Sequence, residues 1–407
     1  MKLWPFFTSK RIYADAAAAT PLSRSAKREL LRLLPLFGNP GSLHSEGVQA
    51  KQELENAREK VAKTIGAHAD EIIFTSGGTE ANNLALFGTL RPLLHARGEL
   101  NAITSAIEHL SVLEPLRTLE RDGLYTTELS VNESGHIAAK ELREALSEET
   151  ALVSVQMVNS EIGTIQNIRE IAKEIRHARR SRVESPGANA PSPLPLYFHT
   201  DASQAPLWLP IKVEKLGIDM LTLDAQKMMG SKGAGALYIK RGTDLEPLLW
   251  GGGQERGLRS GTENAVMAGA LATALEEAQT GVEERAQRIE LVRDFMFKEI
   301  QKRIPEAELN GAIGKGRVAN NINISIPGLD ALMAVIALDA EGVAVSARSA
   351  CSSDDEEPSY VIKALGKSGD KAKSAIRITL LPSATMADAA QIANALAIVA
   401  KRYRNVV

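Results

Sequence analysis

Apolar residues along the chain follow two periods, which predict strands alternating with helices. Short runs that are apolar on both faces and rich in β-branched residues lie at 72–75, 152–158, 196–200, 220–223 and 235–239. Residues 45–65 instead place apolar side chains at helical spacing, and Gly66 follows the last of them. Strands without a polar face have to be covered by helices on both sides. This part of the chain therefore predicts an α/β fold in which a sheet lies between two helix layers.

The pattern changes beyond residue 265. Two helical segments at 266–279 and 283–303 are followed by predicted strands at 321–326 and 375–379 and by a closing helix. Thr385 and Asp388 have the spacing of a capping box at the start of that helix. A chain of 407 residues is also too long for one ordinary core. We therefore expect a large domain over residues 14–265 and a smaller one formed by residues 1–13 and 266–407.

The composition excludes several classes of protein. With 48 basic and 50 acidic side chains, the formal net charge of −2 provides no field for binding nucleic acid or an anionic membrane. No apolar stretch reaches the length of a membrane span, and the apolar start of the chain is broken by Pro5. A single cysteine rules out an internal disulfide and a multi-cysteine metal site. We expect a cytoplasmic protein that binds no metal, no nucleic acid directly and no membrane.

That single cysteine, Cys351, stands among small, hydroxylic and acidic residues. The segment from about 346 to 360 has few large apolar side chains, which is typical of an accessible loop and not of a buried thiol. An accessible thiol is prone to oxidation, so its presence favours a chemical role. A lone cysteine is nevertheless more often incidental than catalytic, and the other motifs have to decide between the two.

A predicted strand that runs into a glycine turn and a helix start forms the strongest local motif. The sequence Thr75-Ser76-Gly77-Gly78-Thr79 gathers unpaired backbone N–H groups and the positive end of a helix dipole. Such a turn suits a phosphate group, with the Thr79 hydroxyl as a further donor, and it lacks the lysine of a nucleotide P-loop. A purely structural turn would also explain the glycines.

Two polar side chains follow predicted strands at the edge where α/β proteins bind ligands. Lys227 lies in a turn of small residues, where its amine is placed to form a Schiff base with a carbonyl group. Asp201 ends a buried strand, where a carboxylate would keep the ring nitrogen of a pyridine cofactor protonated. The alternatives are a solvated surface lysine and an aspartate that only caps the end of a strand.

The phosphate turn, the strand-end aspartate and the lysine follow one another in the order found in pyridoxal-phosphate enzymes of the aminotransferase fold. The chain resembles the class V branch of these enzymes, and within it the housekeeping cysteine desulfurases, over nearly its whole length. Further matching segments lie at 13–21, 39–44, 108–109, 158–163, 259–264 and 349–360. The resemblance implies a type I aminotransferase-like α/β fold. Its large domain would hold a mostly parallel seven-stranded sheet between helices, and its smaller C-terminal domain would be α+β.

The resemblance also implies how pyridoxal 5′-phosphate, the cofactor of this family, would be bound. Lys227 would hold the cofactor as a Schiff base, and His109 would stack on the pyridine ring and move protons. Asp201 would pair with the ring nitrogen, and Gln204 would donate to the phenolic oxygen.

The phosphate ligands implied by the resemblance come from two subunits. Gly78 and Thr79 would hold the phosphate from one subunit and Thr262 would reach it from the other, which implies a homodimer with composite sites. Where the family has a serine and a histidine before the lysine, both phosphate ligands, this chain has Asp224 and Gln226. Gln226 can still donate a hydrogen bond, whereas Asp224 brings a carboxylate towards an anion. Two like charges about 4 Å apart cost roughly 4 kcal/mol at an effective dielectric constant of about 20. Either Asp224 turns away towards a cation or a backbone N–H, which we expect, or cofactor binding is weakened.

L-cysteine is the substrate that the resemblance implies. Arg377 would clamp its carboxylate, a bidentate task that suits a guanidinium group. Cys351 would attack the substrate sulfur, keep it as a persulfide and release L-alanine. The persulfide would then pass to an acceptor protein, either an iron–sulfur scaffold or a tRNA-thiolation relay. Ser160 stands beside the cofactor and substrate where the family usually has asparagine, so that this contact would need a water molecule or be lost.

Two other interpretations of the same motifs stay open. One is another class V activity, either selenocysteine cleavage or transamination; transamination needs no cysteine nucleophile, so the position of Cys351 counts against it. The other is a degenerate homologue that catalyses nothing and acts by binding partners through the acidic loop. Ser160 and Asp224 are the features that keep this second interpretation open.

Overall fold

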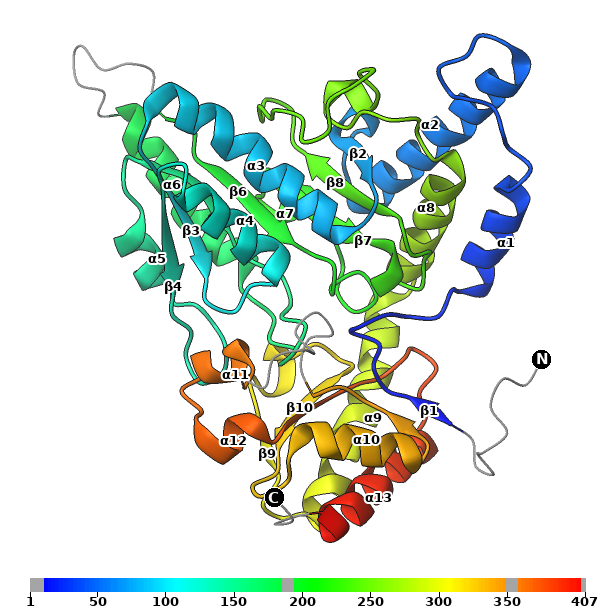
Figure 1. Cartoon of the computed structure of the whole chain (residues 1–407), viewed down its shortest axis with the longest axis vertical. Helices are drawn as coiled ribbons and strands as arrows, with labels where there is room; N and C mark the ends of the chain where they lie inside the picture. The colour runs from blue at the N-terminus through cyan, green and yellow to red at the C-terminus, as the bar shows by residue number, and fades with distance from the viewer. Residues whose placement is uncertain (1–10, 185–193, 348–357, 404–407) are drawn as a thin grey trace.

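A seven-stranded sheet forms the centre of the larger part of the molecule in the computed structural model, which describes residues 11–184, 194–347 and 358–403 (Figure 1). The strands are β2 (Ile72–Thr75), β3 (Leu100–Ser105), β4 (Leu124–Leu129), β5 (Thr150–Ser154), β6 (Tyr197–Asp201), β7 (Met220–Asp224) and β8 (Gly235–Ile239). Their order is β2-β8-β7-β6-β5-β3-β4, and only β8 runs antiparallel to its neighbours. The mostly parallel seven-stranded sheet implied by the sequence is confirmed. The predicted strand at 152–158 is too long, because β5 ends at Ser154.

Helices cover both faces of this sheet, as strands without a polar face require. One layer consists of α3 (Gly78–Arg97) and α4 (Leu110–Glu120), which lie in front of the sheet in Figure 1. The other layer consists of α2 (Ser45–Ile65), α6 (Ile168–Glu184), α7 (Val213–Leu216) and α8 (Ala265–Gln279), with α1 (Arg24–Leu33) packed on α8 and α5 (Ala139–Ala145) on α6. Within β2, Ile73 packs with the first layer whereas Ile72 and Phe74 pack with the second. Alternate side chains of a strand therefore pack into two separate cores, one on each face of the sheet.

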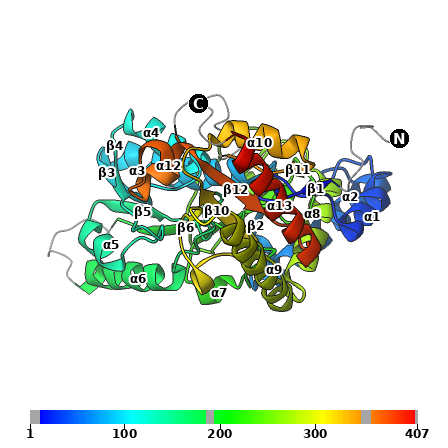
Figure 2. The same ribbon diagram turned by 90° about the horizontal axis from the view of Figure 1, so that it is seen from below.

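The smaller part of the molecule lies below the sheet in Figure 1. Its antiparallel sheet places β10 (Asn321–Ser325) between β9 (Glu308–Leu309) and β12 (Ala375–Thr379), and β1 (Ile12–Tyr13) pairs in parallel with β11 (Val343–Ala344). Its helices are α9 (Val282–Arg303), α10 (Ala331–Ala340), α11 (Tyr360–Ala364), α12 (Gly369–Lys373) and α13 (Met386–Tyr403). Seen from below, α9 and α13 lie side by side (Figure 2). None of the helices that the structure describes is long and apolar enough to cross a membrane.

Local signals in the sequence explain where several elements begin and end. The helix predicted at 45–65 is α2, and it ends at Gly66 with a left-handed φ of 74° that favours glycine. The predicted capping box is also present, since the backbone N–H of Thr385 donates to Asp388 at 3.0 Å and that of Asp388 donates to Thr385 Oγ1 at 3.2 Å. The limits of the two expected domains stay a prediction.

Candidate active site

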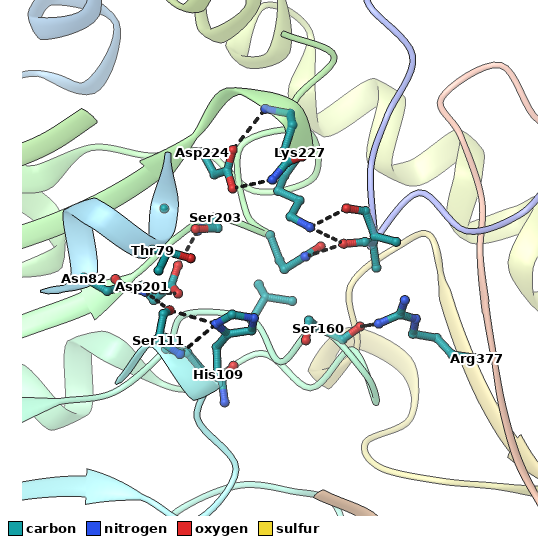
Figure 3. Close-up of a pocket in the computed structure, with 17 residues that line it drawn as sticks. Thr79, Asn82, His109, Ser111, Ser160, Asp201, Ser203, Asp224, Lys227 and Arg377 are labelled. Carbon is teal, nitrogen blue, oxygen red and sulfur yellow. Dashed lines mark hydrogen bonds between the residues drawn. The ribbon is translucent and has the colours of Figure 1, made fainter. Parts of the chain in front are cut away.

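A cavity of about 170 Å³ opens where β6 and β7 end, and the smaller sheet contributes to its wall (Figure 3). The predicted site residues that line it are Gly78, Thr79, His109, Ser160, Asp201, Gln204, Asp224, Gln226, Lys227 and Arg377. Two predicted residues are not in this group. Thr262 lines a separate hollow together with Ser76 and Arg259, and Cys351 lies outside the described residues.

Lys227 lies in a 3₁₀ turn, η2 (Ala225–Lys227), which directly follows β7. Its amine points into the cavity, where Nζ donates to the backbone oxygens of Ala17 at 2.9 Å and Ala18 at 2.5 Å (Figure 3). Gln204 Nε2 donates to the same Ala17 oxygen at 2.9 Å. The side chain of Lys227 is therefore held by the segment that follows β1, and the alternative of a solvated surface lysine is wrong.

Asp201 ends β6, and both of its carboxylate oxygens accept hydrogen bonds. The backbone N–H of Ser203 donates to Oδ1 at 2.8 Å, and the side-chain amide of Asn82 donates to Oδ2 at 2.8 Å. Because an ionised carboxylate only accepts hydrogen bonds, it fixes the amide of Asn82 with its nitrogen towards Asp201. The same nitrogen also donates to Ser111 Oγ at 2.8 Å.

His109 precedes α4 and caps its first turn. Its Nδ1 accepts the backbone N–H of Ser111 at 3.1 Å and lies 2.7 Å from Ser111 Oγ. A ring nitrogen that accepts an N–H carries no proton, so the neutral imidazole has its proton on Nε2. Since Asn82 donates to the Ser111 hydroxyl, that hydroxyl has its own proton left for Nδ1. Asp201, Asn82, Ser111 and His109 thus form one hydrogen-bonded chain across the cavity wall (Figure 3).

Side chains would be crowded at Gly78, in the glycine turn before α3, and at Gly235, on the neighbouring strand β8. A Cβ on Gly78 would lie 3.0 Å from Ser203 Oγ and 3.3 Å from Asp224 Oδ2, and a Cβ on Gly235 would lie 2.6 Å from the backbone of Gly77. Strand β8 therefore presses against the turn from one side and the cavity lies on the other. The first N–H groups of α3 and the Thr79 hydroxyl remain as donors at the cavity wall.

Asp224, at the end of β7, stays in the cavity wall. Its Oδ1 accepts the backbone N–H of Gln226 at 3.1 Å, and its Oδ2 accepts the Gln226 side-chain amide at 3.1 Å. Only 7% of the residue is exposed. Burial, the largest influence, raises the pKa of Asp224 above its ordinary value, while the neighbouring Lys227 acts to lower it. The expected backbone N–H partner is therefore present, but the carboxylate does not turn away from the cavity or from Gly78.

Two further titratable groups close to Asp201 are fully buried, and burial shifts the pKa of each in the direction that favours its neutral form. Glu108 accepts the backbone N–H of Gln156 at 2.9 Å and the hydroxyl of Ser105, but burial raises the pKa of Glu108 to about 8. His199 lies between hydroxyls of neighbouring strands, and burial lowers its pKa to about 4.

Arg377, on β12, brings the smaller sheet to the cavity. Its guanidinium is almost wholly buried and donates to Asp15 Oδ1 at 2.8 Å and to the backbone oxygen of Ser160 at 3.2 Å. Its backbone pairs with that of Ser346, through hydrogen bonds of 2.7 Å and 3.1 Å. The guanidinium is thus oriented by two acceptors, and Ser160 contributes through its backbone.

The described residues that follow position 357 are also fixed near the cavity. Ser359 donates its hydroxyl to Glu161 at 2.6 Å, and the Tyr360 hydroxyl donates to the backbone oxygen of Glu108 at 2.5 Å. Together with Ser346 beside Arg377, these contacts hold both flanks of the segment that contains Cys351 close to the site.

Asn82, Ser111 and Ser203 also line the cavity, although the sequence assigned no role to them. Helical spacing offers a signal for Asn82, which stands four residues after Gly78 and so shares its helix face. Ser111 and Ser203 stand two residues after His109 and Asp201, which is the spacing of local side-chain-to-backbone turns.

Comparisons with known proteins agree with this geometry. The model of the Aminotransferase class-V family matches residues 12–392. A cysteine desulfurase IscS of Dictyoglomus turgidum is 40% identical over 372 residues, which cover 91% of this chain and 90% of that protein. A solved NifS-like protein has a TM-score of 0.86 at 30% identity and covers 96% of this chain and 99% of its own.

A second solved structure, SspA in complex with cysteine, has a TM-score of 0.76 at 32% identity and covers 92% of this chain and 100% of its own. The family predicted from the motifs is therefore confirmed, and the names of the relatives agree with the predicted branch. The chain belongs to the class V aminotransferase family.

Proposed function

We propose that this chain is a pyridoxal-phosphate-dependent cysteine desulfurase, which converts L-cysteine to L-alanine and keeps the sulfur as a persulfide on Cys351. One observation carries the proposal: the Lys227 amine, the Asp201 carboxylate and the His109 imidazole line one cavity whose far wall contains Arg377. Relatives named cysteine desulfurase support it, as does the solved relative in complex with cysteine.

Pyridoxal 5′-phosphate fits the donor set of this cavity. Backbone N–H groups at Gly78 and the hydroxyls of Thr79 and Ser203 suit a phosphate, and Asp201 suits a protonated ring nitrogen. The cradle at Gly78, which a Cβ would fill, supports close approach of a ligand to the backbone. When bound, the cofactor supplies an electron sink for the bonds that break at the substrate. The chain supplies attachment, orientation and proton transfer.

Proton transfer is assigned to His109 and Lys227. Because Nδ1 of His109 accepts from Ser111, its Nε2 carries the transferable proton of the neutral ring. The amine of Lys227 acts as the nucleophile that attaches the cofactor, once it has given up a proton. The Ala17 and Ala18 oxygens keep that amine inside the cavity.

Sulfur transfer is assigned to Arg377 and Cys351. Arg377 would bind the carboxylate of L-cysteine, with its guanidinium already oriented by Asp15 and by the Ser160 backbone. The Cys351 thiolate would then attack the substrate sulfur. As the new S–S bond forms, the substrate C–S bond breaks, and its carbon takes the electron pair and a proton to give L-alanine. Contacts of Ser346 and Ser359 near the cavity support delivery of the thiol to this site.

We further propose a homodimer that works in the cytoplasm and passes sulfur to an iron–sulfur scaffold or a thiolation relay. Large apolar side chains support the dimer, since Phe37, Leu43 and Trp250 are 84%, 96% and 78% exposed in the single chain. Thr262, which lies apart from the cavity of its own chain, would reach the phosphate site of the partner subunit.

The test is to reconstitute the purified chain with pyridoxal phosphate, record the visible absorption band of lysine-bound cofactor, and measure the products from L-cysteine. We expect the band, L-alanine and sulfide. Lys227→Ala should lose the band, while Lys232→Ala, a matched change of an exposed lysine in the same turn, should keep it. A keto acid as product would indicate transamination, and a strong preference for selenocysteine would indicate a selenocysteine lyase. A chain that binds no cofactor would be the degenerate homologue.

A further inference from the structure

Asp224 is a buried carboxylate at the place where the cofactor's phosphate is expected. We propose that the site takes up one proton from solvent when it binds pyridoxal phosphate, and that Asp224 and the phosphate share this proton. The proposal rests on the proposed function only in taking pyridoxal phosphate as the cofactor.

The carboxylate of Asp224 lies beside the glycine turn, where an anion bound by that turn would be close to it. Its Oδ2 lies 3.3 Å from the position of a Cβ on Gly78, the first residue of α3, and Ser203 Oγ lies 3.0 Å from the same point. The carboxylate oxygen is therefore close to the N-terminus of α3, where the phosphate is expected. The hydrogen bonds that Asp224 accepts come from Gln226 in its own turn, so they cannot move the carboxylate away.

The positive charge that faces Asp224 is too small to balance the negative charges of both the carboxylate and a bound phosphate. Lys227, in the same turn, contributes one positive charge, and Asp201, on the neighbouring strand, contributes a second negative charge. Helix α3 and the turn after β6 contribute only neutral donors here: backbone N–H groups, Thr79 and Ser203. A phosphate monoester adds a charge of about −1.5 to −2 at pH 7. Burial already raises the pKa of Asp224, and the phosphate would raise it further.

A proton shared between Asp224 and the phosphate would remove the repulsion between these two anions without any further residue. A protonated Asp224 offers an O–H donor to the phosphate, which is the role of the serine that the family has at this position. The Asp224–phosphate pair then binds one proton more than the separate partners, so its contribution to cofactor affinity is largest at low pH. It falls about tenfold per pH unit between the pKa of Asp224 in the free site and its higher pKa in the complex.

Isothermal titration in two buffers with different ionisation enthalpies measures the proton uptake directly at pH 8. The attachment of the cofactor to Lys227 also moves a proton, so pyridoxal, which attaches in the same way but lacks the phosphate, serves as the reference ligand. On the wild-type chain we expect pyridoxal phosphate to take up about one proton more than pyridoxal. Asp224→Asn should abolish this difference, and Asp122→Asn, a change of an exposed turn carboxylate, should leave it unchanged.

Equal proton uptake with the two ligands on the wild-type chain would overturn the proposal. So would an excess that persists in Asp224→Asn, because the proton would then belong to another group. The wild-type comparison decides the matter even if the Asp224→Asn chain does not fold. A chain that develops no band of lysine-bound cofactor with either ligand would instead contradict the proposed function itself, and this inference with it.

Discussion

Asp201 and Asp224 have the same local structure but differ in the source of their second hydrogen bond. Each terminates a strand of the large sheet, is less than a tenth exposed, and accepts the backbone N–H of the residue two positions later. Asp201 also accepts an amide from α3, a different element, whereas the second partner of Asp224 is Gln226 in its own turn. The side of the cavity at Asp201 is thus fixed by tertiary contacts, and the side at Asp224 is fixed only locally.

The comparison indicates that the group of the bound cofactor next to a buried carboxylate would determine whether that carboxylate is stable as an anion. A protonated ring nitrogen beside Asp201 would stabilise a full negative charge there. A phosphate beside Asp224 would destabilise one. In our proposal, the same residue type at equivalent strand ends therefore pairs with a protonated ring nitrogen in one place and donates a proton to a phosphate in the other.

The same substitution at both positions should have very different effects. We expect Asp201→Asn to lower kcat/KM by about 100-fold or more, because it removes the charge that stabilises a protonated ring. Asp224→Asn should lower it far less and should bind the cofactor more tightly than wild type above pH 8. Steady-state kinetics and cofactor titrations on both variants measure this contrast. Equal losses at the two positions would mean that the two carboxylates do not differ in role.

A buried carboxyl close to Asp201 should make stability depend on pH. Because the pKa of Glu108 is raised to about 8 in the folded chain, the folded state keeps a proton that the unfolded state has lost above about pH 4.5. Stability from this group therefore falls as pH rises towards 8, by up to about 1.4 kcal/mol per pH unit. Glu108→Gln should remove that slope. Urea denaturation at several pH values checks this, and parallel curves for variant and wild type would contradict it.

A smaller effect is expected from the hydrogen-bonded chain between Asp201 and His109. Asn82→Ala removes the donor to both Asp201 and Ser111 and should lower kcat by about 10-fold, with little change in KM. Ser111→Ala should cost less, since its backbone N–H still donates to Nδ1. Asn56→Ala, a matched change at an exposed position of α2, serves as the control. Nitrogen NMR of His109 gives a second readout: the Ser111 backbone N–H should keep the neutral ring in its Nε2–H form in wild type and in the Asn82→Ala chain, and a proton on Nδ1 in the neutral wild-type ring would contradict this account.

Much of this arrangement could be predicted from the sequence, because its signals are local. The glycine turn, the strand-end Asp201 and the turn with Lys227 are short motifs whose chemistry follows from neighbouring residues. The periodicity of residues 45–65 likewise gave both ends of α2.

What the sequence could not reveal depends on contacts between distant segments. The link from Asp201 through Asn82 to Ser111 joins three elements, and no spacing along the chain indicates it. The sequence raised the conflict at Asp224 but could not show that a backbone N–H from Gln226 would leave the carboxylate beside Gly78. Cys351 remains a prediction, since it lies outside the described residues.

The central claim is that Lys227 holds the cofactor and Cys351 accepts the sulfur. The most direct test is a single turnover with one equivalent of L-cysteine per subunit, followed by mass spectrometry of the peptide that contains Cys351. We expect that peptide to gain one sulfur atom in the same molar amount as L-alanine is released. The Cys351→Ser chain should keep the absorption band of bound cofactor and carry no added sulfur. L-alanine formed without sulfur on Cys351 in the wild-type chain would contradict the account.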